Sequence, residues 1–144
     1  MIVIDSREKS YSHISEYFDN QNVPYEVRKL ETGDYLNTDN PSVIVDRKAS
    51  LDEILGNLTR GDRSRFNREC QRAFADKIRF IVLIESDEYE TVESIKSWKS
   101  KYVRLNGRWL ASEMFRLTMA YRVEWRFCKK QDTARKILEL VRYE

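Results

Sequence analysis

Apolar residues in this chain occur in short runs separated by charged segments, and their spacing predicts the secondary structure. Short apolar runs bounded by turn residues are typical of buried strands. The runs near residues 2–5 and 78–85 are strongly apolar. Pro24 stands at the start of another strand, where its missing N–H is tolerated. Strands are predicted over residues 2–5, 23–30, 34–36, from 43 into the charged run that follows, 78–85 and 123–128.

Apolar residues three and four positions apart predict the helices between these strands. Tyr11, Ile14 and Phe18 have this spacing. Ser50 and Glu53 have the spacing of a capping box at the start of another helix. Helices are predicted over residues 10–20, after Ser50, from a loop at 59–63 to about 75, over 91–98, 108–121 and 132–142, with a loop at 100–107. Strands alternating with helices indicate an α/β fold with a mixed central sheet flanked by helices.

Length and composition restrict the class of protein. The chain has 144 residues, of which 35% are charged and 12% aromatic, as expected for one globular domain, 1–144. The net charge of +2 does not by itself indicate nucleic acid, so any DNA-binding surface must be local. No apolar stretch has the length of a membrane span or a signal segment. We expect no membrane association and a cytoplasmic location.

Cysteine and histidine content excludes several kinds of site. Cys70 and Cys128 are far apart and lack metal-binding spacing, which favours reduced, packed thiols. His13 is the only histidine. A zinc site and Ser-His or Cys-His catalysis are therefore not expected.

A charged run at the end of a predicted strand carries the candidate chemistry. The apolar residues 43–45 lead directly into Asp46, Arg47 and Lys48. Because side chains alternate along a strand, Asp46 and Lys48 should project from the same face. With Asp34, which follows Gly33, they would form a site for Mg²⁺ or Mn²⁺, ions that prefer oxygen ligands. A divalent ion of this kind can activate water for phosphodiester cleavage.

Several motifs together resemble the nuclease domain of XPF-type structure-specific endonucleases, a branch of the PD-(D/E)XK superfamily. They occur in the family's order over residues 1–86, with Asp46 in the place of the family's Glu. The motifs are Asp5-Ser6-Arg7-Glu8, Gly33-Asp34-Tyr35, Asp46-Arg47-Lys48 followed by Asp52, Ile54-Leu55-Gly56-Asn57-Leu58, and Arg65-Phe66-Asn67-Arg68-Glu69 before a strand that ends in Glu85.

The resemblance implies a restriction-endonuclease-like core and a set of site residues. Asp34 and Asp46 would bind the metal, and Lys48 would orient or deprotonate water. Asp5 and Glu8 would border the same site, Asp5 as a further ligand, although such carboxylates can equally be turn or cap residues. Arg47 would contact DNA phosphate or pair internally with Asp52 or Glu8. The resulting catalytic set is Asp5, Glu8, Asp34, Asp46, Arg47 and Lys48.

Two basic segments are candidate DNA contacts. The first holds five arginines, of which Arg65 aligns with a site arginine of the family, and guanidinium groups match phosphate geometry. The others could equally form a solvated helix face. The second segment, 98–109, has four basic residues, three aromatic residues and no acidic residue. Basic residues beside aromatic residues suit single-stranded or distorted DNA, although a loop with inward-packed Trp residues is the simpler interpretation. The first segment comprises Arg60, Arg63, Arg65, Arg68 and Arg72.

The last two predicted helices carry more apolar surface than one side of a small sheet needs. XPF-type nuclease domains pair through this region, so a homodimer is predicted. We expect no tandem helix-hairpin-helix or helicase domain, and a partner protein could supply structure recognition.

The function implied is a metal-dependent endodeoxyribonuclease that cleaves branched, flapped or forked DNA, or single-strand/double-strand junctions, in repair or recombination. A non-catalytic DNA-binding or scaffolding subunit is the alternative. A sequence-specific restriction nuclease would need an element that reads base edges, and none is evident.

Overall fold

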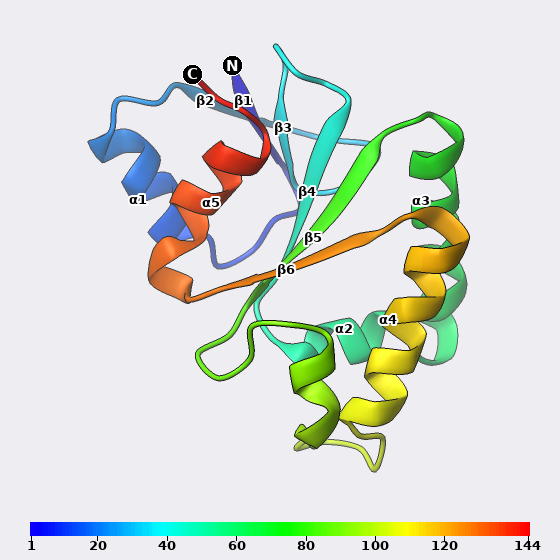
Figure 1. Cartoon of the computed structure of the whole chain (residues 1–144). Helices are drawn as coiled ribbons and strands as arrows, with labels where there is room; N and C mark the ends of the chain where they lie inside the picture. The colour runs from blue at the N-terminus through cyan, green and yellow to red at the C-terminus, as the bar shows by residue number, and fades with distance from the viewer.

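The structure is a computed structural model that describes residues 1–144, apart from the side chains of residues 60–62. The chain forms one six-stranded sheet in the order β2-β1-β3-β4-β5-β6 (Figure 1). Arg60 is one of the candidate DNA contacts, and its side chain lies outside the described part of the structure. The strands are β1 (Ile2–Asp5), β2 (Tyr25–Arg28), β3 (Tyr35–Asn37), β4 (Val43–Lys48), β5 (Arg79–Glu85) and β6 (Glu124–Cys128).

The sheet is mixed, because β3 is antiparallel to both of its neighbours. β1 pairs with β2 in parallel and with β3 in antiparallel fashion. β4 is antiparallel to β3 and parallel to β5, and β5 is parallel to β6. The α/β class with a mixed, helix-flanked sheet is thus confirmed. The helices are α1 (Ser12–Asn20), α2 (Leu51–Asn57), α3 (Arg60–Ala75), α4 (Gly107–Tyr121) and α5 (Thr133–Leu140), with 3-10 turns η1 (Glu93–Ser97) and η2 (Lys130–Asp132).

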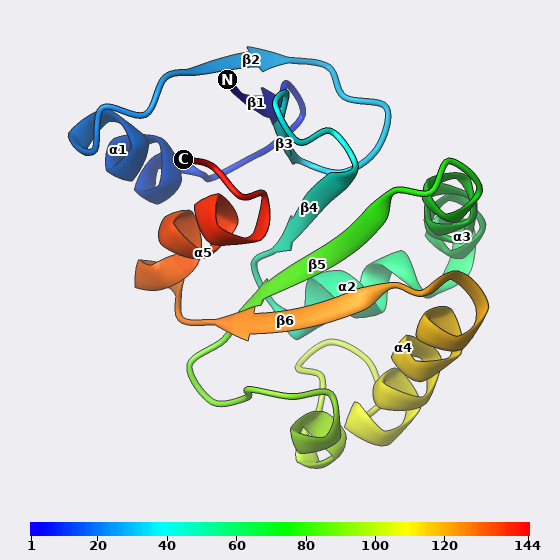
Figure 2. The same cartoon turned by 45° about the horizontal axis from the view of Figure 1, so that its top comes forward.

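Helices cover both faces of the sheet. α1 and α5 lie on one face, and α2, α3 and α4 lie on the other (Figures 1 and 2). Alternation along the central strands divides the core in two. Ile44, Val82 and Ile84 pack toward α2, α3 and α4, whereas Val45 and Leu83 pack toward α1 and α5.

Local sequence signals explain several element ends. Ser50 has an extended backbone and its Oγ accepts a hydrogen bond from Glu53 N at 3.1 Å, so the predicted capping residue is confirmed. Glu53 reaches back to accept from Ala49 N at 3.3 Å. The side chain of Asn106 caps α4 in the same way, by accepting from Trp109 N.

Other predicted boundaries are wrong. α3 begins at Arg60, so the loop predicted over 59–63 is largely part of this helix. Charged residues suit the exposed first turns of a helix as well as a loop, and composition alone does not separate the two. β2 is shorter than predicted, since its edge position leaves it mostly exposed. The helix predicted over 91–98 is a 3-10 turn.

The cysteines are free, with Cys70 buried, as predicted. Burial raises the pKa of the Cys70 thiol to about 12, which keeps it protonated and unreactive. Among the described residues, no helix is long and apolar enough to cross a membrane.

Candidate active site

β4 presents its charged residues to opposite faces of the sheet. Asp46 and Lys48 lie on the face covered by α2 and α3, and Lys48 Nζ is 3.0 Å from Asp46 Oδ2. Lys48 Nζ also lies 5.4 Å above the ring of Phe66 from α3. Arg47 projects from the other face, as strand alternation predicts. All three residues are buried, although they are charged.

A tight turn brings Asp34 to the same strand. Gly33 has a positive φ of 70°, which favours glycine, and a Cβ there would also overlap the Ile44 side chain. The backbone of Asp34 pairs with Val45 O at 2.9 Å. Its carboxylate Oδ2 accepts a hydrogen bond from Arg47 N at 2.8 Å. The structure therefore brings Asp34 and Asp46 together, although they lie twelve positions apart in the sequence.

The surroundings of Asp34 perturb its pKa. Burial raises the pKa of Asp34 well above its usual value, and the negative charges of Asp46 and Glu8 add to this effect. Burial alone would lower the pKa of Lys48, but the adjacent charge of Asp46 outweighs it and the net shift is upward. The folded protein thus disfavours the negative charge of Asp34 and favours the positive charge of Lys48.

These residues line a cavity of about 430 Å³ between β3, β4 and α3. Its carboxylates come from four segments of the chain, and arginines from α3 stand around it. Besides Gly33, Asn57 and Phe66, the lining comprises the acids Asp5, Glu31, Asp34, Asp46 and Glu69 and the bases Arg7, Lys48, Arg65, Arg68 and Arg72.

The donor set of this cavity fits a hard divalent cation. Asn57 Oδ1 is buried with no hydrogen-bond partner among the described residues, and Asp46 Oδ2 is buried with Lys48 as its ion-pair partner; both residues line the cavity. Within the described part of the chain, no three His, Cys, Asp or Glu side chains cluster closely enough to hold a metal alone. Mg²⁺ commonly takes only one or two carboxylates together with water and phosphate oxygens, so Asp34 and Asp46 suffice.

Asp5 borders the cavity, but its oxygens already have partners. Oδ1 accepts from Leu30 N at 2.7 Å, and Oδ2 accepts from Arg7 Nε at 3.0 Å. Arg7 also donates to Leu30 O at 2.6 Å. Asp5 therefore holds the end of β1 to the segment after β2, and its role as a metal ligand stays a prediction.

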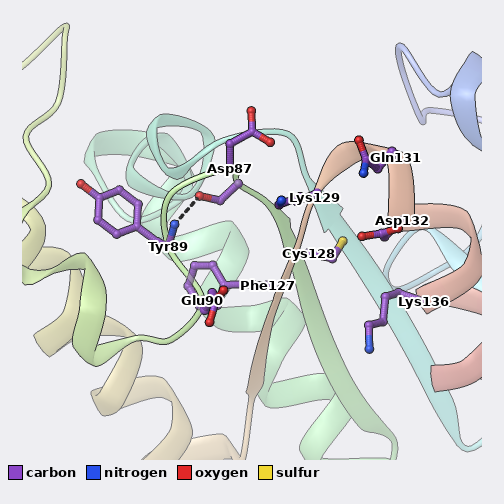
Figure 3. Close-up of a pocket in the computed structure, with 10 residues that line it drawn as sticks. Asp87, Tyr89, Glu90, Phe127, Cys128, Lys129, Gln131, Asp132 and Lys136 are labelled. Atoms are coloured by element: carbon purple, nitrogen blue, oxygen red, sulfur yellow. Dashed lines mark hydrogen bonds between the residues drawn. The ribbon is translucent and has the colours of Figure 1, made fainter.

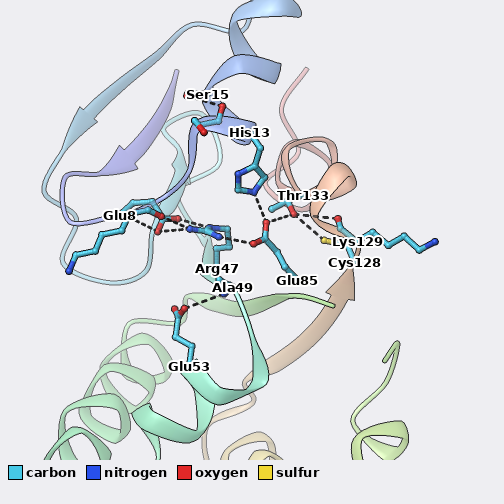
Figure 4. Close-up of polar contacts among 12 residues, drawn as sticks. Glu8, His13, Ser15, Arg47, Ala49, Glu53, Glu85, Cys128, Lys129 and Thr133 are labelled. Carbon is cyan, nitrogen blue, oxygen red and sulfur yellow. Dashed lines mark hydrogen bonds and ion pairs between the residues drawn. The ribbon is translucent and has the colours of Figure 1, made fainter. Parts of the chain in front are cut away.

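Glu8 and Arg47 belong to a buried network on the opposite face of the sheet (Figure 4). Arg47 Nε donates to Glu8 Oε2 at 3.0 Å, and Arg47 Nη1 donates to Glu85 Oε1 at 2.8 Å. Glu85 Oε2 accepts from Thr133 Oγ1 at 2.7 Å and lies 2.6 Å from His13 Nε2. Neither Glu8 nor Arg47 is among the described residues that line the cavity. Of the predicted alternatives for Arg47, the structure shows internal pairing with Glu8.

The predicted arginines of α3 have different surroundings. Arg65 and Arg68 line the cavity, and Arg68 also donates to Ser64 Oγ at 2.6 Å. Arg63 points toward α4, where its Nη2 lies 2.8 Å from Glu113 Oε1. Arg72 donates to Glu31 O at 3.0 Å and stands over the turn before Asp34. The DNA-binding role of Arg63, Arg65 and Arg68 stays a prediction.

Comparison with known proteins gives the family. The ERCC4 domain matches residues 4–140. The chain belongs to the ERCC4 domain family. The resemblance to XPF-type nuclease domains is thereby confirmed, and the motif residues all lie inside the matched range.

The fold of this ERCC4 domain is similar to that of XPF from Aeropyrum pernix. One structure of that protein matches with a TM-score of 0.72, 22% identity and coverage of 98% of this chain and 63% of that chain. A second, XPF from Aeropyrum pernix in complex with DNA, matches with a TM-score of 0.71, 22% identity and coverage of 98% and 62%. This chain thus spans less than two thirds of the length of those chains. No curated protein matches it.

Glu69 and Asn57 are cavity residues that the sequence interpretation did not assign. Glu69 Oε1 accepts a hydrogen bond from Gly33 N at 3.2 Å, so α3 holds the turn that carries Asp34. Burial and the charge of Asp46 raise the pKa of Glu69. The sequence contained one signal that Glu69 belongs to the cavity. Glu69 lies four residues after Arg65, and residues four apart share one face of a helix.

A second hollow of about 400 Å³ lies at the carboxyl ends of β5 and β6 (Figure 3). Asp87, Asp132, Lys129 and Lys136 are among its lining residues, together with Cys128. It shares no lining residue with the cavity over Asp46, and none of the predicted site residues lies in it. This hollow is therefore not part of the candidate site.

Proposed function

We propose that this ERCC4 domain is a divalent-metal-dependent DNA endonuclease. It hydrolyses phosphodiester bonds in branched, flapped or forked DNA during repair or recombination. The observation that carries the proposal is the convergence of Asp34, Asp46 and Lys48 in one cavity bordered by arginines. The complex with DNA formed by XPF from Aeropyrum pernix, which has the same fold, supports it.

Asp34 and Asp46 would hold Mg²⁺ or Mn²⁺, and Asn57 offers a further oxygen. When bound, the ion polarises the phosphate and lowers the pKa of water. Lys48 stays protonated because Asp46 raises its pKa. Its role would be to place positive charge beside the phosphate and to orient the attacking water, or to deprotonate that water.

The arginines at the cavity would hold the DNA backbone. Arg65 and Arg68 come from one helix, α3, and both line the cavity that contains the acids. Guanidinium contacts to phosphate position DNA without reading its sequence. Such contacts suit an enzyme that selects DNA by structure.

Cleavage of labelled flap, fork, splayed-arm and plain duplex DNA tests this function directly. We expect cuts near the junctions with Mg²⁺ or Mn²⁺ and no cuts with EDTA. Asp46→Asn, which keeps the shape of the side chain, should remove the activity. Cleavage that persists in EDTA, or that is unchanged in Asp46→Asn, would contradict the proposal.

One feature favours a second candidate, a non-catalytic DNA-binding or scaffolding subunit. Asp46 is one methylene shorter than the Glu of the family motif, and it is already paired with Lys48. If the purified chain binds the same substrates but cleaves none of them with either metal, this alternative replaces the first.

We also propose that two copies of the chain pair through α4. Phe115 and Met119 are exposed on this helix, and Met119, at 85%, is the most exposed large hydrophobic residue of the described part of the chain. The buried residues of α5, in contrast, pack in the core on the other face of the sheet. Exposed apolar patches often mark interfaces, and two-fold pairing is the commonest arrangement.

Light scattering over a concentration series tests the pairing. We expect about twice the chain mass for the parent. Met119→Glu should shift the protein toward monomer without a loss of thermal stability, because the side chain does not contribute to the core. A monomer at high micromolar concentration would exclude the homodimer.

A further inference from the structure

The segment between η1 and α4, residues 98–107, is a loop whose two ends are held together; we call it the basic loop. Gly107 N donates to Trp98 O at 2.7 Å, and Lys99 and Asn106 form an antiparallel bridge. A Cβ on Gly107 would collide with the backbone of Ile95, so glycine permits close contact between the base of the loop and η1. The loop is thus anchored at its base.

A second contact anchors the basic loop to the helix that follows the catalytic strand. Ser100 Oγ donates to Asp52 Oδ1 at 2.6 Å. The same Oγ accepts from Tyr102 N at 3.1 Å and lies within 3.3 Å of Val103 N. Asp52 is in α2, which begins at Leu51, three residues after Lys48. The position of the loop relative to the active-site strand is therefore determined by side-chain contacts.

The tip of the basic loop exposes an aromatic ring among positive charges. Tyr102 is 80% exposed, and Val103 beside it is also exposed. Lys99, Lys101 and Arg104 are exposed, and the loop contains no acidic residue. An exposed aromatic side chain between cations is the combination that proteins use to stack unpaired bases while contacting the phosphates.

We propose that the basic loop binds single-stranded DNA beside the N-terminal end of α2, with Tyr102 stacked on a base and Lys101 and Arg104 beside phosphates. This inference rests on the proposed function, and it specifies which part of a branched substrate the chain holds. Duplex DNA is the poorer occupant, because its bases are already stacked and offer no free face. An extended single strand offers both a free base face and a flexible backbone.

A hollow beside the basic loop determines the side from which the DNA strand approaches. This hollow is lined by Lys101 together with Asp52, Asp87 and Glu88. Those carboxylates repel phosphate, so the strand passes over the exposed tip and not through the hollow. Lys101 lies at the boundary between the acidic hollow and the basic tip.

Binding without cleavage tests the basic loop separately from catalysis. Fluorescence anisotropy in EDTA would compare splayed-arm DNA, which has single-stranded arms, with blunt duplex of the same length. For Tyr102→Ala we expect affinity for the splayed arms about 5- to 100-fold lower, with duplex affinity little changed. Tyr102→Phe is the matched variant and should bind within about twofold of the parent, because the phenyl ring still stacks.

Charge and stacking are separated by a further variant. Lys101→Ala combined with Arg104→Ala should weaken splayed-arm binding and reduce its salt dependence, because fewer counterions are released. Thermal melting of each variant, expected to match the parent, shows whether the fold is intact. A 2-aminopurine base in the arm gives a second readout: its fluorescence should fall on binding to the parent and to Tyr102→Phe, but not to Tyr102→Ala.

Failure of the loop proposal and failure of the nuclease proposal are distinguishable. Equal splayed-arm affinity of Tyr102→Ala and the parent overturns the loop proposal and leaves the nuclease proposal standing. An equal loss in Tyr102→Phe and Tyr102→Ala overturns stacking. A parent that binds splayed arms through Tyr102 but cleaves nothing supports the loop and overturns the nuclease. A parent that binds no DNA overturns both.

Discussion

Lys48 and Asp46 form an ion pair on one face of β4, with Nζ 3.0 Å from Oδ2. Both side chains are largely buried, and Asp34 stands beside them with a pKa raised by burial and by Asp46. Buried charges are costly unless they are paired, and removal of one partner leaves the other uncompensated. The pair therefore keeps an acid and a base in the cavity at a cost to stability, as is common where chemistry takes place.

Neutralising either member of this pair should abolish cleavage. We expect Asp46→Asn and Lys48→Gln to lower the cleavage rate of flap DNA by about 100-fold or more, the usual size of a lost electrostatic or acid–base contribution. Asp39→Asn is the control, since the Asp39 side chain is 86% exposed. Single-turnover rates would measure the effect, and rates equal to the control would refute the assignment.

The arginines of α3 should give DNA binding its salt dependence. Arg65→Ala should weaken binding to every DNA structure by a similar factor and reduce the salt slope by about one. Arg135→Ala, on α5 at the opposite face, removes a half-exposed arginine that pairs with Glu139. Affinities measured over a range of salt concentrations would compare the two. Equal slopes for both variants would exclude a phosphate contact by Arg65.

Asp34→Asn should stabilise the fold while it removes activity. The folded state disfavours the charged carboxylate, because burial, Asp46 and Glu8 raise the pKa of Asp34. The ionised group therefore costs stability at neutral pH, and this cost disappears as the pH falls below the usual value of 3.8. Asn can still accept the hydrogen bond from Arg47 N. We expect a free energy of unfolding higher by on the order of 1 kcal/mol near pH 7.

Added metal provides the control for this experiment. Mg²⁺ or Mn²⁺ should raise the melting temperature of the parent, because a ligand of the folded state stabilises it, and should raise that of Asp34→Asn less. A variant that is less stable than the parent near neutral pH, or one that responds fully to metal, would be inconsistent with this site.

Glu85 should make stability depend on pH in the direction opposite to that of Asp34. Burial alone would raise its pKa, but Thr133, His13 and Arg47 outweigh burial and lower the pKa from 4.5. A carboxylate whose pKa is lower in the folded state than in the unfolded state stabilises the protein at pH values above its ordinary pKa. This contribution is lost as the pH falls through the folded-state pKa. Glu85→Gln should therefore cost up to about 3–5 kcal/mol near pH 7, since Glu8 is then the one carboxylate that pairs with Arg47 among the described residues, and less in acid.

Urea unfolding at several pH values would measure the Glu85 effect. Glu139→Gln is the matched control on the surface of α5, where an exposed pair contributes at most about 1 kcal/mol. A loss for Glu85→Gln as small as that of the control would show that the network is not important for stability.

Glu69 should act by positioning Asp34. Glu69→Gln keeps an oxygen that can accept from Gly33 N, whereas Glu69→Ala removes it. We expect Glu69→Ala to slow cleavage about tenfold or more through misplacement of the turn, and Glu69→Gln to retain most of the rate. Equal losses in both variants would instead indicate that the charge of Glu69 is required.

The sequence by itself determined which side of β4 each charged residue occupies. A period of two is a property of the extended backbone, so Asp46 and Lys48 must share a face and Arg47 must oppose them. Short-range signals likewise determined the start of α2 after Ser50. The order of the motifs was sufficient to predict the family, and the alternation of strands with helices predicted the mixed, helix-flanked sheet.

Only the tertiary structure decided which groups meet across the fold. Arg47 pairs with Glu8 and Glu85, and Glu69 reaches the Gly33 turn, because distant segments pack against the same strands. Partner choice among charged residues depends on distance and burial, and neither is encoded in local spacing. The same reason explains why Asp5 was assigned from its motif alone, whereas its oxygens are occupied by Arg7 and by Leu30 N, a residue 25 positions away.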